Sequence, residues 1–257
     1  MTLKHLFTVL TIVSCTLLGF TACNDEDYAP IHLKILNGEG QLNHNTLYLN
    51  AFSAGESFLI IGGNGRYVIE NKSSNIVDYR YDGHTLNIIP KGVGTATVLI
   101  KDHAGNQMTL TIEVSNPTSL FKVIDIETKA YGDNMTGGNM KQLEKEMQDE
   151  SLMKIGGDLL LTYTNKEYTE GSVTIHPTPS GRPVVGTFQQ EEKFSTNNVP
   201  YQEFKVTLAD NRVIIWQLLN YNVETGKEML LQEDMTEVYI HRYPTLEKAT
   251  LTYTITH

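Results

Sequence analysis

The clearest indication of the fold is the stretch Gly94-Thr95-Ala96-Thr97-Val98-Leu99-Ile100. From Thr95 to Val98 polar and apolar side chains alternate, and residues 109–114 show the same alternation. Successive side chains of a strand point to opposite faces, so each of these segments has one apolar face. Half-buried strands of this kind are typical of antiparallel sheets.

Similar runs, rich in Val, Ile, Thr and Tyr, occur on the N-terminal side of this stretch. They are separated by turn residues such as Gly62-Gly63-Asn64-Gly65 and Asp82-Gly83. The segments that we interpret as strands are residues 31–36, 46–50, 57–61, 67–71, 76–81, 85–89, 95–101 and 108–114. Short strands at this spacing predict an all-β sandwich over residues 31–116.

Residues 54–116 resemble the bacterial immunoglobulin-like domains of surface proteins. The matching segments are Ala54-Gly55-Glu56, Ser74-Asn75-Ile76-Val77 and the run 90–98, which carries a Gly-Thr-Ala-Thr signature before the penultimate strand. Gly92 and Gly94 permit a close approach and a positive φ there. The loop 62–65 is shorter than the insert common in the family. The resemblance implies an immunoglobulin-like β-sandwich that serves as a spacer or adhesive module.

A second β-rich unit is predicted for residues 120–257, after a linker at residues 117–119 that begins with Pro117. We expect its strands at residues 121–130, 158–164, 171–176, 183–189, 201–208, 212–221, 227–232 and 250–256. Asp210-Asn211 predicts a tight hairpin. The apolar run 214–219, which includes Trp216, predicts a central strand covered on both sides.

Two short helices are expected among these strands. Residues 139–150 show a one-sided apolar stripe, with Asn139 as N-cap and Gln142 three residues later, in the manner of a capping box. Asp234 begins a second helix that is expected to end at Tyr243, before Pro244. This order predicts a small barrel or curled antiparallel sheet. The pattern loosely resembles the lipocalin-like cups of bacterial surface lipoproteins.

The N-terminal segment indicates secretion. Lys4 and His5 precede an apolar stretch, and the small residue Ala22 stands directly before Cys23, which opens an acidic run. This resembles a lipobox, which implies that residues 1–22 are a lipoprotein signal peptide and that Cys23 is acylated. Residues 23–30 would then be an acidic tether, and the acidic run resembles the export tag of lipoproteins displayed on the outer membrane.

Three other interpretations of this segment remain open. The stretch could be a permanent transmembrane helix, although it is short for a bilayer span. It could be an ordinary signal peptide that leaves a free thiol, or Cys15 could be the acylated residue, since Ile12-Val13-Ser14 also matches a lipobox. We expect the membrane to be reached through a lipid anchor at Cys23, with the protein exposed at the cell surface.

Charge and cysteine content exclude several classes of protein. Removing residues 1–22 changes the formal net charge from −10 to −11, because Lys4 is the charged residue that leaves. No basic cluster remains, so we expect no nucleic-acid partner. With Cys15 removed and Cys23 acylated, the mature chain has no intramolecular disulfide, thiolate zinc site or cysteine nucleophile.

Catalysis is not favoured by the sequence either. The histidines after the leader lack the spacing of a zinc site, and no Gly-x-Ser-x-Gly motif is present. Carboxylate residues that could serve a glycosidase are Glu191-Glu192, Glu203, Glu233-Asp234 and Glu237. Nothing in the sequence ties any two of them together, so we expect no enzyme, no metal and no cofactor.

Aromatic residues are the better indication of function. The chain has 13 tyrosines against 8 phenylalanines, and flat rings can stack on sugars. The candidate ligand-binding residues are Tyr163, Tyr168, Tyr201 and Tyr221. They could equally be structural, because tyrosine is favoured on half-buried strands.

The leading hypothesis is a non-catalytic surface lipoprotein, in which an immunoglobulin-like stalk carries a C-terminal domain that binds a carbohydrate or protein ligand. A structural or accessory subunit of an outer-membrane assembly is the first alternative. A small glycan hydrolase is the second. The sequence leaves the identity of the ligand and the oligomeric state open.

Overall fold

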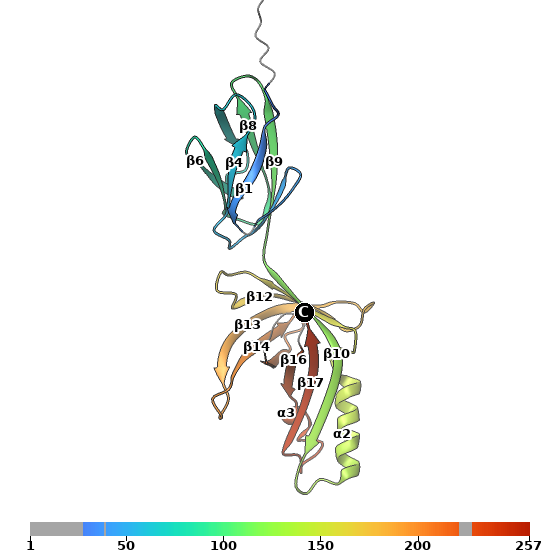
Figure 1. The fold of residues 1–257 in the computed structure, drawn as a ribbon. Coiled ribbons are helices and arrows are strands. Elements are labelled where there is room, and N and C mark those ends of the chain that lie inside the picture. The colour runs from blue at the N-terminus through green and yellow to red at the C-terminus, as the bar shows by residue number, and fades with distance from the viewer. Residues whose placement is uncertain (1–27, 39, 221–227) are drawn as a thin grey trace, which may run out of the picture.

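A computed structural model describes residues 28–38, 40–220 and 228–257 (Figure 1). The signal segment, Cys23 and Tyr221 lie outside the described residues. The fold is mainly β, as predicted, and consists of a β-sandwich followed by a closed barrel. The dipeptide Asn116-Pro117 separates the last strand of the sandwich from the first strand of the barrel.

The sandwich is made of two sheets. Its strands are β1 (His32–Gly38), β2 (Gln41–Asn43), β3 (Thr46–Asn50), β4 (Glu56–Ile61), β5 (Tyr67–Asn71), β6 (Val77–Tyr81), β7 (Thr85–Pro90), β8 (Gly94–Asp102) and β9 (Gln107–Ser115). One sheet has the order β1-β4-β7-β6 and the other the order β2-β3-β9-β8-β5. Phe58 and Leu86 from the first sheet pack with Leu110 and Ile112 from the second in the core.

The pairing of the sandwich strands follows the sequence in part. β8 and β9 are antiparallel, as the alternation predicts, but β9 also pairs with β3 in parallel. The short strand β2 was not expected. Gly94 has the positive φ that was anticipated (141°), whereas Gly92 does not. A Cβ at Gly92 would still lie 3.1 Å from the carbonyl oxygen of Asn75, so the close approach is present there.

The second unit is an antiparallel barrel that closes between its first and last strands. The strands are β10 (Thr118–Tyr131), β11 (Asp158–Tyr163), β12 (Glu170–His176), β13 (Val184–Phe194), β14 (Pro200–Leu208), β15 (Val213–Leu219), β16 (Met229–Asp234) and β17 (Lys248–Thr256). Their spatial order equals their order in the chain, and β10 also pairs with β17. This closed meander has lipocalin-like fold character.

Several details of the barrel differ from the sequence-based expectation. Thr118 and Ser119, expected in the linker, pair with Thr162 and Leu161 and so belong to β10. The run 214–219 is not covered on both sides, since Ile215 is 40% exposed on the outer face of the barrel while Trp216 is buried. Every strand of a barrel has one face that points outward. An apolar residue on that face makes the sequence look continuously apolar, although only the inward face is buried. The hairpin at Asp210-Asn211 is confirmed: Asn211 has φ 67°.

Helix α2 (Gly137–Glu150) begins two residues earlier than expected. Thr136, and not Asn139, is its N-cap, because the Thr136 hydroxyl accepts a hydrogen bond from the Asn139 N–H. Gln142 donates to Glu146 instead of closing a capping box. Helix α3 (Thr236–Tyr239) is shorter than expected and lacks a side-chain cap at Met235.

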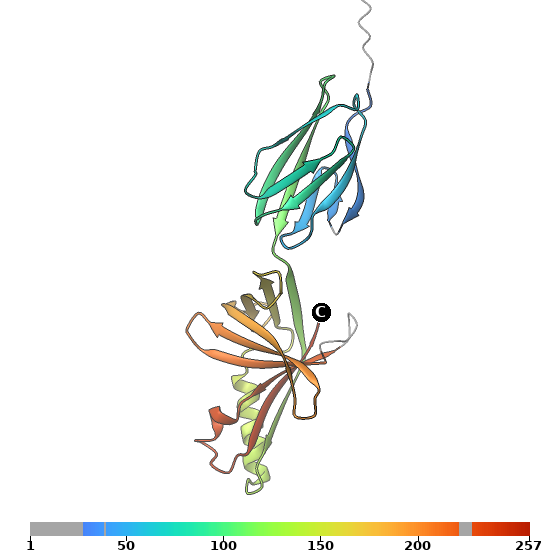
Figure 2. The same ribbon diagram turned by 90° about the vertical axis from the view of Figure 1, so that its left-hand side faces the viewer.

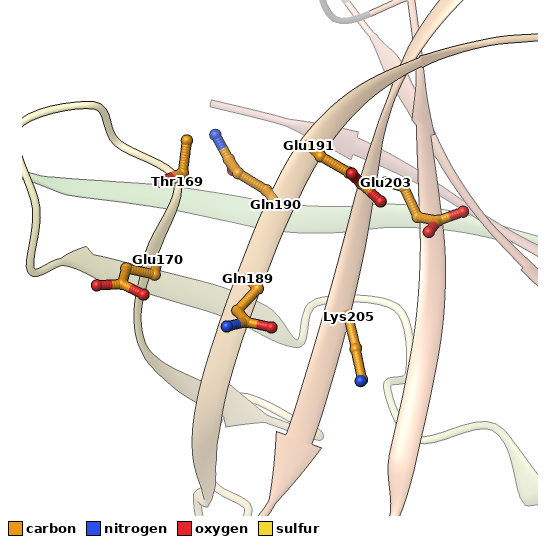
Figure 3. Close-up of a pocket in the computed structure, with 7 residues that line it drawn as sticks. All are labelled: Thr169, Glu170, Gln189, Gln190, Glu191, Glu203 and Lys205. Carbon is orange, nitrogen blue, oxygen red and sulfur yellow. The ribbon is translucent and has the colours of Figure 1, made fainter.

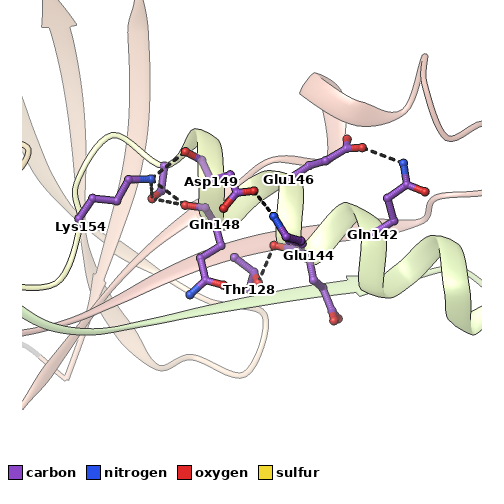
Figure 4. Close-up of polar contacts among 9 residues, drawn as sticks. Thr128, Gln142, Glu144, Glu146, Gln148, Asp149 and Lys154 are labelled. Atoms are coloured by element: carbon purple, nitrogen blue, oxygen red, sulfur yellow. Dashed lines mark hydrogen bonds and ion pairs between the residues drawn. The ribbon is translucent and has the colours of Figure 1, made fainter.

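Helix α2 lies against β10 on the outside of the barrel (Figures 1 and 2). Leu143 and Met147 enter a small core that also contains Tyr239 from α3. Hydrogen bonds fix both flanks: the Thr128 hydroxyl donates to the Glu144 carbonyl, and Lys154 Nζ donates to the last carbonyls of the helix (Figure 4). A cation at the C-terminal end also complements the helix dipole.

Candidate functional site

The barrel interior is largely filled by side chains. Alternate residues of every strand point inward, and Trp216, Tyr253 and Phe188 are among the largest fully buried side chains. A filled interior leaves no room for a long lipid chain. The space that remains is at the end of the barrel nearest the sandwich, where the C-terminus also lies (Figure 1).

We call this space the mouth. It is a cavity of about 200 Å³, lined by residues of strands β10, β11, β13, β14, β15 and β16 and by His257. Its apolar walls include the rings of Phe121 (β10), Tyr163 (β11) and Phe204 (β14). Binding pockets for drug-sized ligands start at about 300 Å³, so the mouth has room for one ring-sized group.

Polar groups converge on the same cavity. The mouth is also lined by Ser119, Gln190, Gln202 and His257. The side-chain oxygen of Gln190 is buried and has no hydrogen-bond partner within the described part of the chain. Leaving a buried acceptor unpaired costs about 1–3 kcal/mol, so a rotation of the Gln190 side chain that brings this oxygen to a ligand donor in the mouth would be favoured.

Tyr163 links the mouth to the core. Its hydroxyl donates to Ser119 Oγ at 3.3 Å, and burial raises the pKa of the Tyr163 hydroxyl. The Tyr163 ring meets the Phe188 ring edge to face, with 5.6 Å between centroids, and Phe188 in turn contacts Phe204. The ring at the mouth is therefore held in one orientation by its neighbours.

A loop of the sandwich reaches the same aromatic group. Tyr168 lies 5.1 Å from Tyr163 and 6.0 Å from Phe52, measured between ring centroids. Asn50 Nδ2 donates to the Tyr168 hydroxyl at 3.2 Å. Tyr168 has a positive φ (57°), which is uncommon for a residue other than glycine. The two domains thus touch through Tyr168.

The candidate tyrosines from the sequence occupy different places. Tyr163 lines the mouth and Tyr168 packs behind it. Tyr201 lies on β14 opposite Lys193, on the face that alternates with the inward residues Gln202 and Phe204, so it points away from the mouth. Tyr221 is outside the described residues.

Sequence reasoning missed Gln190, Gln202 and Phe204 as site residues. The alternation of β14 could have shown that Gln202 shares a face with Phe204. The position of Gln190 opposite Phe204 depends on the β13–β14 register, which the sequence does not specify.

A second hollow lies on the outer face of β12, β13 and β14 (Figure 3). We call it the outer groove; its volume is about 310 Å³. Glu170, Gln189 and Lys205 stand in one row across the three strands, because Glu170 pairs with Gln189 and Gln189 with Lys205. The groove is also lined by Thr169, Gln190, Glu191 and Glu203.

Glu191 and Glu203, two of the carboxylates that could serve a glycosidase, both line this groove. Glu191 and Glu203 are directly opposite each other on β13 and β14. Both accept from Lys193 Nζ, at 2.8 and 2.5 Å, and these hydrogen bonds raise the pKa of the lysine. One ammonium group thus bridges two carboxylates and offsets one of their two negative charges, an arrangement suited to holding side chains in place.

A buried polar cluster lies deeper in the barrel. Trp216 Nε1 donates to Glu233 Oε2 at 3.1 Å. Burial raises the pKa of Glu233, and the indole hydrogen bond offsets this only in part. Burial, together with the nearby Glu233 carboxylate, also raises the pKa of Tyr253.

Within the described ranges, no group of three or more His, Cys, Asp or Glu side chains is arranged to hold a metal ion. His176 contacts Asp158 at 2.6 Å, as a pair across neighbouring strands. Among the same residues, no helix combines the length and apolarity needed to cross a bilayer.

Comparison with known proteins does not assign the chain to a family. No protein-family model matches it, and no curated protein sequence matches it.

Proposed function

We propose that this chain is a non-catalytic lipoprotein of the outer membrane, exposed at the cell surface, whose barrel mouth binds one ring of a carbohydrate. The observation that carries the proposal is the mouth itself: fixed aromatic rings beside the unpaired amide oxygen of Gln190. A sugar ring offers both an apolar face for stacking and hydroxyl donors. The cavity volume suits a single ring.

The other parts of the chain fit this role. Acyl chains on Cys23 would anchor the protein, since two or more chains give stable membrane attachment. The sandwich, which we take to be immunoglobulin-like, would hold the barrel away from the membrane. Its loop at residues 50–53 supports Tyr168 and, through it, the wall of the mouth.

Calorimetry with the full chain in detergent micelles tests the proposal. The titrants are glucose, galactose, mannose, xylose and N-acetylglucosamine at millimolar concentration. At least one is expected to bind, and Gln190→Ala or Gln202→Ala should weaken it by roughly five- to tenfold, the value of a lost hydrogen bond.

Tyr201→Ala is the matched control, because Tyr201 lies on the same barrel but faces away from the mouth. Its affinity should equal that of the unmodified chain. Binding that Tyr201→Ala abolishes and Gln190→Ala leaves intact would place the site elsewhere, and no binding of any sugar would reject the proposal.

A further inference from the structure

We propose that the outer groove is a second subsite for the same ligand, which is then a neutral oligosaccharide that extends from the mouth across β13. This inference rests on the proposed sugar-binding function of the mouth. To that function it adds a second binding site, the class of ligand, and the residues that determine which ligand binds.

The two hollows meet at Gln190. This residue lines both the mouth and the outer groove. Its main-chain N–H donates to the carbonyl of Thr169 at 2.7 Å, and Thr169 also lines the groove. A ligand that occupies the mouth therefore needs to pass only the Gln190–Thr169 rim to reach the groove, a path that suits a chain of linked rings.

The groove presents both acceptors and donors to a ligand. Glu170 offers carboxylate oxygens, Gln189 an amide and Lys205 an ammonium group, in one row. Neither Glu170 nor Lys205 has an ion-pair partner in the part of the chain that the structure describes. Strands are spaced about 4.8 Å apart, so the charged groups at the ends of the row stand on strands roughly 10 Å apart.

A hydroxyl group donates and accepts, so a polyol can pair with all three side chains of the row. The neighbouring Glu191 and Glu203 are held on Lys193, which keeps one wall of the groove in a fixed arrangement. Because the side chains of this wall are already ordered, less conformational entropy is lost when a ligand binds.

The charged groups of the outer groove limit the class of ligand that it can bind. The groove contains three carboxylates, from Glu170, Glu191 and Glu203, against the ammonium groups of Lys205 and the adjacent Lys193. The chain as a whole carries a formal net charge of −10. An anionic glycan would meet repulsion from this field, so the groove favours a glycan without acidic groups, and we take a neutral oligosaccharide as its ligand.

The test compares monosaccharides with trisaccharides on the full chain in detergent micelles. Calorimetry is run with glucose, galactose, mannose, xylose and N-acetylglucosamine, and with the unbranched trisaccharide of each. For the sugar that binds, the trisaccharide is expected to bind at least about tenfold more tightly, the effect of added hydrogen bonds to charged groups.

Variants separate the two subsites. Glu170→Gln and Lys205→Met should each remove most of the trisaccharide advantage while leaving monosaccharide affinity unchanged, whereas Gln190→Ala should weaken both. The matched controls are Glu237→Gln and Lys122→Met, which change exposed residues of the same domain outside both hollows. These controls should bind as the unmodified chain does.

Each alternative result has a distinct meaning. Equal affinity for monosaccharide and trisaccharide, with silent groove variants, would overturn the second subsite and leave the mouth in place. A trisaccharide advantage that persists in both Glu170→Gln and Lys205→Met would also overturn it. Failure of every sugar to bind would overturn both the second subsite and the proposed function.

Discussion

Glu233 is an ionisable residue in apolar surroundings. Its half-buried side chain lies against the apolar barrel core, where the Trp216 indole N–H donates to the carboxylate and the Tyr253 ring lies nearby. Burial penalises the charged form more than this hydrogen bond favours it, so the pKa of Glu233 is raised above its ordinary value of 4.5.

The raised pKa makes stability depend on pH. Below pH 4.5 the carboxyl is neutral in both the folded and the unfolded chain, and its contribution is fully present. As the pH rises through the folded-state pKa this contribution is lost, at about 1.4 kcal/mol for each unit of pKa shift. Glu233→Gln is neutral throughout, so its free energy of unfolding should increase relative to the unmodified protein from pH 4.5 upward.

Urea unfolding between pH 4 and pH 8 measures this difference. Glu237→Gln serves as the control, because Glu237 is exposed on α3 and its replacement should leave the pH profile unchanged. If the free energy of unfolding changed with pH in the same way for Glu233→Gln and for the unmodified protein, ionisation of Glu233 would not destabilise the fold.

At the scale of elements, glycines permit close contacts between neighbouring strands of the barrel wall. A Cβ at Gly171 would lie 2.0 Å from the Thr162 carbonyl oxygen and 2.9 Å from the Phe188 ring. Gly171 pairs with Phe188, so the ring covers the position where a side chain is missing. Glycine in a strand often marks a site where another part of the backbone approaches closely.

Gly171→Ala is therefore expected to destabilise the barrel. Neither the backbone carbonyl nor the packed ring can move away freely, and overpacking of this kind costs about 1–3 kcal/mol. Gly137→Ala is the comparison, because no atom lies within 4 Å of a Cβ there and the residue begins α2. Thermal or urea unfolding should show a loss for Gly171→Ala and little change for Gly137→Ala; equal stabilities would contradict the close contact.

Elements could be predicted from the sequence wherever local pattern determines them. The alternation around Ala96 and Val98 gave β8 with one buried face, and the turn residues separated the other strands. Thr136 and Asn139 are comparably good N-caps, so the start of α2 could not be chosen from residue type. Register is also not local: whether Thr118 pairs with Thr162 depends on how the barrel closes.

The candidate site was predictable only in its aromatic part. Tyr163 was identified as one of the tyrosines interleaved with polar residues, and it does line the mouth. Gln190 was not, because nothing in its neighbourhood along the chain distinguishes it from Gln189. Successive side chains of β13 point to opposite faces, so Gln190 lines the mouth while Gln189 stands in the outer row with Glu170 and Lys205.

At the scale of the whole molecule, the protein surface does not favour membrane contact by itself. The mature chain would carry a net charge of −11, which anionic lipid repels. Membrane attachment is instead proposed to depend on the acyl chains at Cys23, whose buried methylene groups contribute about 0.8 kcal/mol each.

Cys23→Ser should release the protein from membranes, because serine has no thiol to acylate. Cell fractionation and mass spectrometry of the N-terminus measure the outcome, with the unmodified chain expected in the outer-membrane fraction and carrying lipid at Cys23. Cys15→Ser is the matched control, since it changes the other cysteine of the same segment and should leave attachment intact. Release by Cys15→Ser alone would move the acylation site to Cys15, and retention of both variants would favour a transmembrane leader over a lipid anchor.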